Sequence, residues 1–155
     1  MKTTPSVELK LKHIDEMKFS VELHDGRMVK LDSSEQMGQS FTPMELFLAA
    51  LAGCTAMDVQ WIMERQRQKV DKFEVCATGT RRDEDPKYYD EVDLEYTIAG
   101  PNLRKDDVER AIRLSQEKYC SVRAMLNDSV KVHITYKIAS NGGPEQEYVY
   151  ASALS

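Results

Sequence analysis

The chain has 155 residues, 41% of them hydrophobic and 30% charged, which is typical of a globular protein with one sizeable core. A net charge of −5 argues against nucleic acid or an anionic membrane surface as a partner, and no uncharged apolar run reaches the ~18 residues of a membrane span. Three cysteines, without a dense framework or a secretory leader, fit a reducing compartment, so we expect a cytoplasmic protein.

The first third of the chain alternates apolar and charged residues, as half-buried strands do. Residues 7–14 (VELKLKHI) and 18–24 (KFSVELH) show this period of two. Asp25-Gly26 is a tight-turn signal, and residues 27–31 (RMVKL) follow it as a returning strand. We therefore predict an antiparallel meander whose apolar face needs a cover.

The longest apolar stretch, FTPMELFLAALAGCTAMDVQWIM, begins with the signals of a helix start. Thr42 and Glu45 have the spacing of a capping box, in which each side chain binds the backbone N–H of the other residue. Pro43 stands at the first helical position, where its missing N–H leaves no bond unmade. A buried helix is therefore expected to begin at this point.

Gly53 interrupts this apolar pattern immediately before Cys54. Because glycine inside a helix costs about 1 kcal/mol relative to alanine, we predict two helices, the second beginning at Cys54. A thiol in the first turn of a helix has a lowered pKa and becomes nucleophilic. Two interpretations stay open, since Cys54 is either such a nucleophile or a small buried hydrophobe. Asp58, one turn later, could repel the thiolate or bind a substrate, but a solvent-facing position is favoured.

The second half of the chain is predicted to alternate between strands and helices. Residues 72–81 and 91–98 alternate as a hairpin, with Cys76 on its polar face and interpreted as structural. Residues 102–119 have the stripe of an amphipathic helix. Cys120 then stands at a break before a short helix, so a second thiol is predicted at a helix start. Residues 129–138 form the last predicted strand.

We expect a single domain over residues 1–138 and a tail over residues 139–155. The tail begins with a Gly-Gly-Pro breaker and is either disordered or docks through residues 148–150 as an extra strand. The histidines show no zinc-ligand spacing, and no phosphate-binding loop occurs, so neither a metal nor a cofactor is expected.

Two cysteines at helix starts have the composition of a peroxide-reducing pair. One thiolate attacks the peroxide and becomes a sulfenic acid, and the second thiol condenses with it to a disulfide. An external dithiol then resets the pair by exchange. This chemistry requires that the Cα atoms of Cys54 and Cys120 come within about 7 Å of each other, which spacing along the chain does not show.

The segments TPMELFLAALAGC and EKYCSVRAML resemble the two cysteine motifs of the OsmC/Ohr family, the osmotically inducible and organic hydroperoxide resistance proteins. The order of elements is similar over residues 5–138, and AGCTAMDV with EKYCSV is most similar to the YhfA-like branch. The resemblance implies an α+β fold with antiparallel sheets around a long central helix, in an intertwined homodimer. It also implies that active sites at the dimer interface reduce organic hydroperoxides with a dithiol.

The resemblance assigns roles to individual residues. Cys54 matches the peroxidatic cysteine and Cys120 the resolving one, while Glu45 matches a glutamate that helps to hold an active-site arginine. Arg27 is the only arginine before residue 65 and is therefore the candidate for that cation, with Arg123 as an alternative. A non-catalytic protein that binds a small hydrophobic ligand at the dimer interface is the alternative function.

Overall fold

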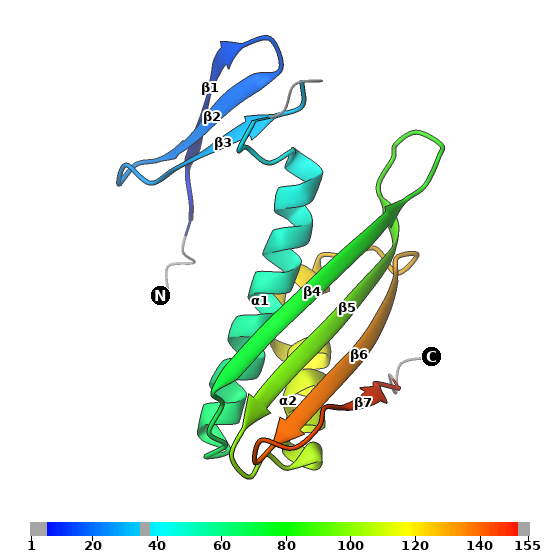
Figure 1. Ribbon diagram of the computed structural model, residues 1–155. Coiled ribbons are helices and arrows are strands. Elements are labelled where there is room, and N and C mark those ends of the chain that lie inside the picture. The colour runs from blue at the N-terminus through cyan, green and yellow to red at the C-terminus, as the bar shows by residue number, and fades with distance from the viewer. Residues whose placement is uncertain (1–5, 35–37, 152–155) are drawn as a thin grey trace, which may run out of the picture. The chain divides into compact units, whose positions relative to one another are not determined.

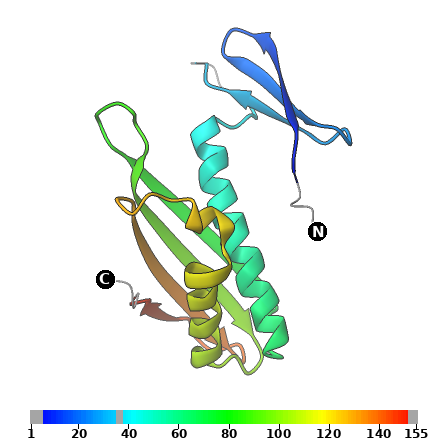
Figure 2. The same ribbon diagram turned by 180° about the vertical axis from the view of Figure 1, so that it is seen from behind.

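The computed structural model describes residues 6–34 and 38–151. The chain divides into two compact units, residues 1–47 and residues 48–155 (Figures 1 and 2). The single domain expected over residues 1–138 stays a prediction.

The first unit contains the predicted meander. Strands β1 (Leu9–Asp15), β2 (Lys18–Leu23) and β3 (Met28–Asp32) pair antiparallel in that order. The turn before β3 depends on Gly26, whose φ of 88° is a conformation that glycine adopts without strain. The predicted strands and turn are therefore confirmed.

One face of the β1–β3 sheet is a shallow apolar groove. Its volume is about 520 Å³, and Pro43 and Leu46 of the first helical turn line it together with residues of the three strands. Leu9 and Leu11 on this face remain more than half exposed, at 54% and 57%. The described residues of the first unit, 6–34 and 38–47, therefore leave these apolar side chains largely uncovered.

Helix α1 (Pro43–Arg65) begins at the predicted capping box. The Thr42 N–H donates to Glu45 Oε2 at 2.8 Å, and the Glu45 N–H donates to Thr42 Oγ1 at 3.2 Å. These two bonds satisfy backbone donors that a helix start otherwise leaves unpaired.

The predicted helix break at Gly53 is wrong, because α1 continues through it to Arg65. A Cβ at Gly53 would meet no atom within 4 Å, so nothing in the described fold requires a glycine there. Leu51, Thr55 and Val59 are fully buried on either side, and burial of their side chains offsets the ~1 kcal/mol cost of the glycine. Cys54 therefore lies in mid-helix, not at a helix N-terminus.

By length and composition α1 could cross a membrane, with a mean hydropathy of 1.5 over its most apolar window. α1 was not identified from the sequence as a possible membrane span because it contains charged residues, which interrupt an uncharged run. The core helix of a soluble protein has the same length and composition.

The second unit is a four-stranded sheet with helices on one face. Strand β4 (Lys72–Arg81) pairs antiparallel with β5 (Tyr89–Gly100), and β7 (Gln146–Val149) pairs antiparallel with β6 (Lys131–Ser140). Strands β5 and β6 are parallel, unlike the antiparallel pairing expected, because the chain crosses over through α2 (Lys105–Leu114) between them. Figures 1 and 2 show α1 and α2 side by side on the same face of this sheet.

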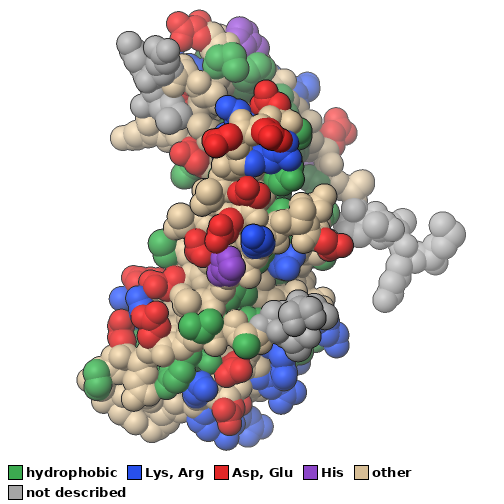
Figure 3. Space-filling view, turned by 90° about the vertical axis from the view of Figure 1, so that its right-hand side faces the viewer, with side chains coloured by type: hydrophobic (Ala, Val, Ile, Leu, Met, Phe, Trp, Pro, Cys, Tyr) green, Lys and Arg blue, Asp and Glu red, His purple; other side chains and the backbone are tan. Residues whose placement is uncertain are grey.

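The core of this unit lies between the sheet and the two helices. Alternate residues of β5 and β6 point into it, and Tyr96 and Tyr136 are the largest fully buried side chains. On the outward face, Lys137 pairs with Glu95 at 2.9 Å and His133 Nε2 with Glu91 at 2.9 Å. Figure 3 shows one face of the molecule with acidic and basic side chains next to each other.

Two segments differ in detail from the expected elements. The helix expected over residues 102–119 is α2 followed by a π-helical turn, Ser115–Tyr119, which leads into the short helix α3 (Ser121–Ala124). The tail returns as β7, where Tyr148 stacks on Tyr136 with ring centroids 5.2 Å apart. Residues 152–155 of the tail lie outside the described residues.

Candidate dithiol site

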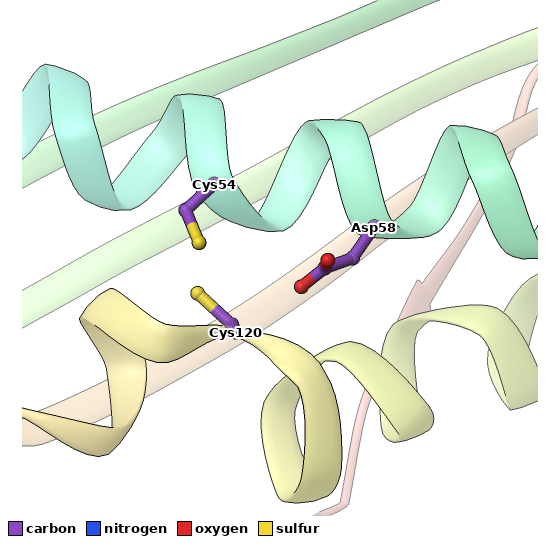
Figure 4. Close-up of side chains that lie close together, drawn as sticks. All are labelled: Cys54, Asp58 and Cys120. Atoms are coloured by element: carbon purple, nitrogen blue, oxygen red, sulfur yellow. The ribbon is translucent and has the colours of Figure 1, made fainter. Parts of the chain in front are cut away.

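The second unit brings two cysteines and one carboxylate together. Cys54 and Asp58 project from the same side of α1, and Cys120 faces them from the turn before α3 (Figure 4). The two sulfurs and a carboxylate oxygen of Asp58 all lie within 4.8 Å of one another. Both thiols are free, Cys120 is only 3% exposed, and Cys54 is half-buried. Cys54 is therefore the more accessible thiol of the pair.

The π-helical turn determines where Cys120 points. The wider turn ends with the Cys120 N–H donating to the Ser115 carbonyl at 2.9 Å. Cys120 then takes an extended conformation as the N-cap of α3, and its sulfur accepts the Arg123 N–H at 3.3 Å. π-Helical turns occur frequently at functional sites. The prediction of a thiol at a helix start is thus confirmed for Cys120.

Burial raises the pKa of the Cys120 thiol to about 11. The Arg123 N–H acts in the opposite direction, and the neighbouring Cys54 and Asp58 raise the pKa further because each disfavours a second negative charge. Cys120 is therefore a protonated thiol at neutral pH, which suits a sulfur that reacts second.

Asp58 does not face solvent, contrary to the expectation from sequence. It is half-buried beside the sulfurs, and its Oδ2 accepts a hydrogen bond from Ser115 Oγ at 3.1 Å. The packing of the π-helical turn against α1 is what covers it, and this contact joins residues far apart in sequence. The carboxylate is therefore a component of the site.

A buried hydrogen-bond network continues from Asp58 into the core. The Thr55 hydroxyl lies 2.9 Å from Ser115 Oγ and 2.6 Å from the Tyr96 hydroxyl. Gln116 Nε2 donates to the oxygens of both Thr55, at 2.9 Å, and Tyr96, at 3.2 Å. Because Thr55 and Ser115 are fully buried, these bonds hold α1, β5 and the π-helical turn in one arrangement.

Comparisons with known proteins identify the family of this chain. A family model described as OsmC-like protein matches residues 36–135. The chain belongs to the OsmC-like family. Protein YhfA of Escherichia coli K12 is 33% identical over 134 residues, covering 86% of this chain and 99% of that protein.

Several solved structures share the fold of this chain. A hypothetical protein from Aquifex aeolicus VF5 is 28% identical, with a TM-score of 0.79 over 89% of this chain and 99% of that one. An organic hydroperoxide resistance protein OsmC from Legionella pneumophila is 18% identical, with a TM-score of 0.68 over 89% and 99% of the two chains. The second likeness concerns the fold alone. Together they confirm the expected OsmC-like α+β architecture.

Two residues to which the OsmC resemblance gives roles lie in the first unit. The Arg27 guanidinium is exposed and binds Asp25, with Nη2 at 2.7 Å and Nε at 2.9 Å from Oδ2. The Glu45 carboxylate binds the Thr42 N–H in the capping box. Their catalytic roles toward Cys54 remain predictions. Arg123 contributes its backbone N–H to the dithiol site.

Cys76 lies apart from the dithiol site. It is exposed on the outward face of β4 with Glu74 and Thr78, the face that the alternation predicts. Cys54 and Cys120 are therefore the cysteines that the fold brings together.

Sequence reasoning missed the polar residues that surround the two thiols of this OsmC-like chain. Thr55 directly follows Cys54, and Ser115 lies in the amphipathic helix predicted over residues 102–119. A hydroxyl at a core-facing helical position needs a hydrogen-bond partner. That requirement could have identified Thr55 and Ser115 as members of a buried polar network. The partner itself, Tyr96 on β5, is visible only in the fold.

Proposed function

We propose that the protein is a thiol-dependent peroxidase that reduces organic hydroperoxides through Cys54 and Cys120. The observation that carries the proposal is the approach of the two sulfurs, which lie within 4.8 Å of each other while both are free thiols. Formation of a disulfide requires side-chain rotations that shorten this separation to about 2 Å. The name of the Legionella relative, an organic hydroperoxide resistance protein, supports the same activity.

The proposed reaction begins at Cys54, which is the more exposed thiol of the pair. Its thiolate attacks the terminal oxygen of the hydroperoxide, the O–O bond breaks, and the alkoxide leaves as an alcohol after it takes a proton. Cys54 becomes a sulfenic acid. The sulfur of Cys120 then attacks the Cys54 sulfur, and hydroxide leaves as water with the Cys120 proton.

Asp58 is placed to assist the second step. The raised pKa of Cys120 means that its proton must be removed as its sulfur attacks. The Asp58 carboxylate is within 4.8 Å of the Cys120 sulfur and can accept that proton and pass it to the leaving hydroxide, which departs as water. An external dithiol then reduces the disulfide by exchange and returns the pair to two thiols.

We propose further that the working molecule is a homodimer in the cytoplasm. Met57 and Trp61 on α1 are 76% and 45% exposed, and Leu9 and Leu11 of the first unit are similarly uncovered. A stable dimer interface of about 2,000 Å² or more would remove such residues from water. The family resemblance, which implies intertwined chains with active sites at the interface, supports this assembly.

The alternative is an OsmC-like protein that binds a small hydrophobic ligand without catalysis. The apolar groove of the first unit favours it, because a volume of about 520 Å³ is in the range of small-molecule sites. The pH dependence of Cys54 alkylation separates the two functions. A Cys54 thiolate that reacts well below pH 8 supports the peroxidase, and an inert thiol supports the binding protein.

The direct test is a thiol count after treatment with cumene hydroperoxide. One equivalent should remove two of the three free thiols and leave Cys76 reduced. Peptide mapping should find Cys54 linked to Cys120. No loss of thiols, or Cys76 in the disulfide, would contradict the proposal, and Cys76→Ser serves as the matched control with full activity.

A further inference from the structure

We infer that the reduced site also binds a soft divalent cation, of which zinc is the physiological example, through Cys54, Asp58 and Cys120. Two thiolates and a carboxylate are a ligand set that zinc accepts. In a tetrahedral zinc site the bond lengths place ligand atoms roughly 3.5–3.8 Å apart. The corresponding atoms are already within 4.8 Å of one another. Side-chain rotations that move these atoms by about 1 Å would therefore give the spacing of a tetrahedral site.

The positions of the ligands on the backbone favour this site. Cys54 and Asp58 are four residues apart on α1, so they share one face of a rigid helix, which is the spacing that helical metal motifs use. Cys120 approaches the same point from the opposite side (Figure 4). Three ligands from two elements are thus held before any ion arrives.

Hydrogen bonds outside the ligand set orient two of the three ligands. Ser115 Oγ donates to Asp58 Oδ2 at 3.1 Å, which leaves Oδ1 for a metal ion. The Arg123 N–H donates to the Cys120 sulfur at 3.3 Å. Outer partners of this kind hold metal ligands in place, and their loss typically weakens metal binding by about 10–100-fold.

Charge gives a further reason for a cation. Within residues 6–34 and 38–151, no lysine or arginine side chain is paired with Asp58 or with either sulfur. Metal binding would release the thiol protons, and a divalent ion would then compensate two of the three negative charges of the two thiolates and the carboxylate. Cys54 and Asp58 are half-buried, so the fourth coordination position is open to water or a solute.

Cobalt(II) is the probe, because tetrahedral thiolate-bound cobalt has intense visible bands and sulfur-to-metal charge-transfer bands. The full-length protein carries Cys76→Ser, which removes the exposed third thiol, and it is titrated under reducing, anaerobic conditions. We expect one cobalt per chain with these bands, and zinc should displace it. Absence of the tetrahedral bands would overturn the inference.

The variants identify the ligands. Asp58→Asn, which preserves shape, should weaken cobalt binding at least tenfold, and Cys54→Ser or Cys120→Ser should reduce the charge-transfer band by about half or abolish binding. Glu64→Gln, on the exposed side of the same helix, is the matched control and should bind cobalt like the parent. Circular dichroism verifies that each variant is folded. Equal affinity of folded Asp58→Asn and parent would refute the ligand set.

These measurements use no peroxide, so their result is independent of whether the protein is a peroxidase. A protein that binds cobalt but fails to consume hydroperoxide would support the metal site and contradict the proposed function.

Discussion

The Thr55 hydroxyl is the centre of the buried hydrogen-bond network next to the two thiols. The substitution Thr55→Val removes this hydroxyl while preserving the shape of the side chain. Thr55 is fully buried and takes part in three hydrogen bonds, to Tyr96 OH, Ser115 Oγ and Gln116 Nε2, at 2.6, 2.9 and 2.9 Å. The substitution therefore tests how much this network contributes to folding.

The expected magnitude follows from what each partner retains. A buried hydrogen bond contributes a net ~1 kcal/mol, so three lost bonds amount to about 3 kcal/mol. Tyr96 and Gln116 still bind each other, and Ser115 still binds Asp58, so none of the three is left wholly without a partner. The additional apolar surface of valine returns up to about 0.8 kcal/mol. We expect a net destabilisation of about 2 kcal/mol.

Urea unfolding at a fixed protein concentration measures this loss. With a slope of about 2 kcal/mol per molar urea, the midpoint should fall by roughly 1 M while the slope stays constant. Thr78→Val, on the exposed outward face of β4, is the matched control and should change stability by less than about 0.5 kcal/mol. A midpoint for Thr55→Val equal to that of the control would refute the energetic role of the network.

The remaining predictions concern the thiols and the residues assigned to them by resemblance. Cys120→Ser should still allow one attack on a hydroperoxide, but its Cys54 should progress to sulfinic acid with excess peroxide, as mass spectrometry would show; a stable sulfenic acid would argue against the resolving role. Because the folded state raises the pKa of Cys120 from 9.0 to about 11, the free energy of unfolding should fall as pH rises between these values, and Cys120→Ala should flatten that slope in urea midpoints. Glu45→Gln and Arg27→Met should each slow the reduction of cumene hydroperoxide by a factor of about ten, which is about 1.4 kcal/mol in the barrier, if the two residues position the peroxide. If both variants reduce the hydroperoxide at the parental rate, neither residue positions the peroxide, and Glu45 acts only as a helix cap. Sedimentation should find a dimer at micromolar concentration, and a stable folded monomer would contradict the proposed assembly.

The sequence by itself determined the local elements of this protein. The period of two in residues 18–24 and 91–98 predicted β2 and β5, because alternate side chains of a strand face opposite sides. Thr42 and Glu45 predicted the start of α1, since a capping box involves only residues three apart. Such signals depend on neighbours along the chain and need no knowledge of the fold.

Tertiary packing decided the features that carry the chemistry. Gly53 predicted a helix break from its intrinsic cost, but burial of the side chains around it outweighs that cost and α1 continues. Asp58 was expected in solvent because nothing near it in the sequence covers it. The π-helical turn that does cover it is distant along the chain. The approach of Cys120 to Cys54 likewise follows from how α1 and that turn pack. Contacts of this kind arise from the burial of a shared core, whose geometry no local pattern of residues encodes.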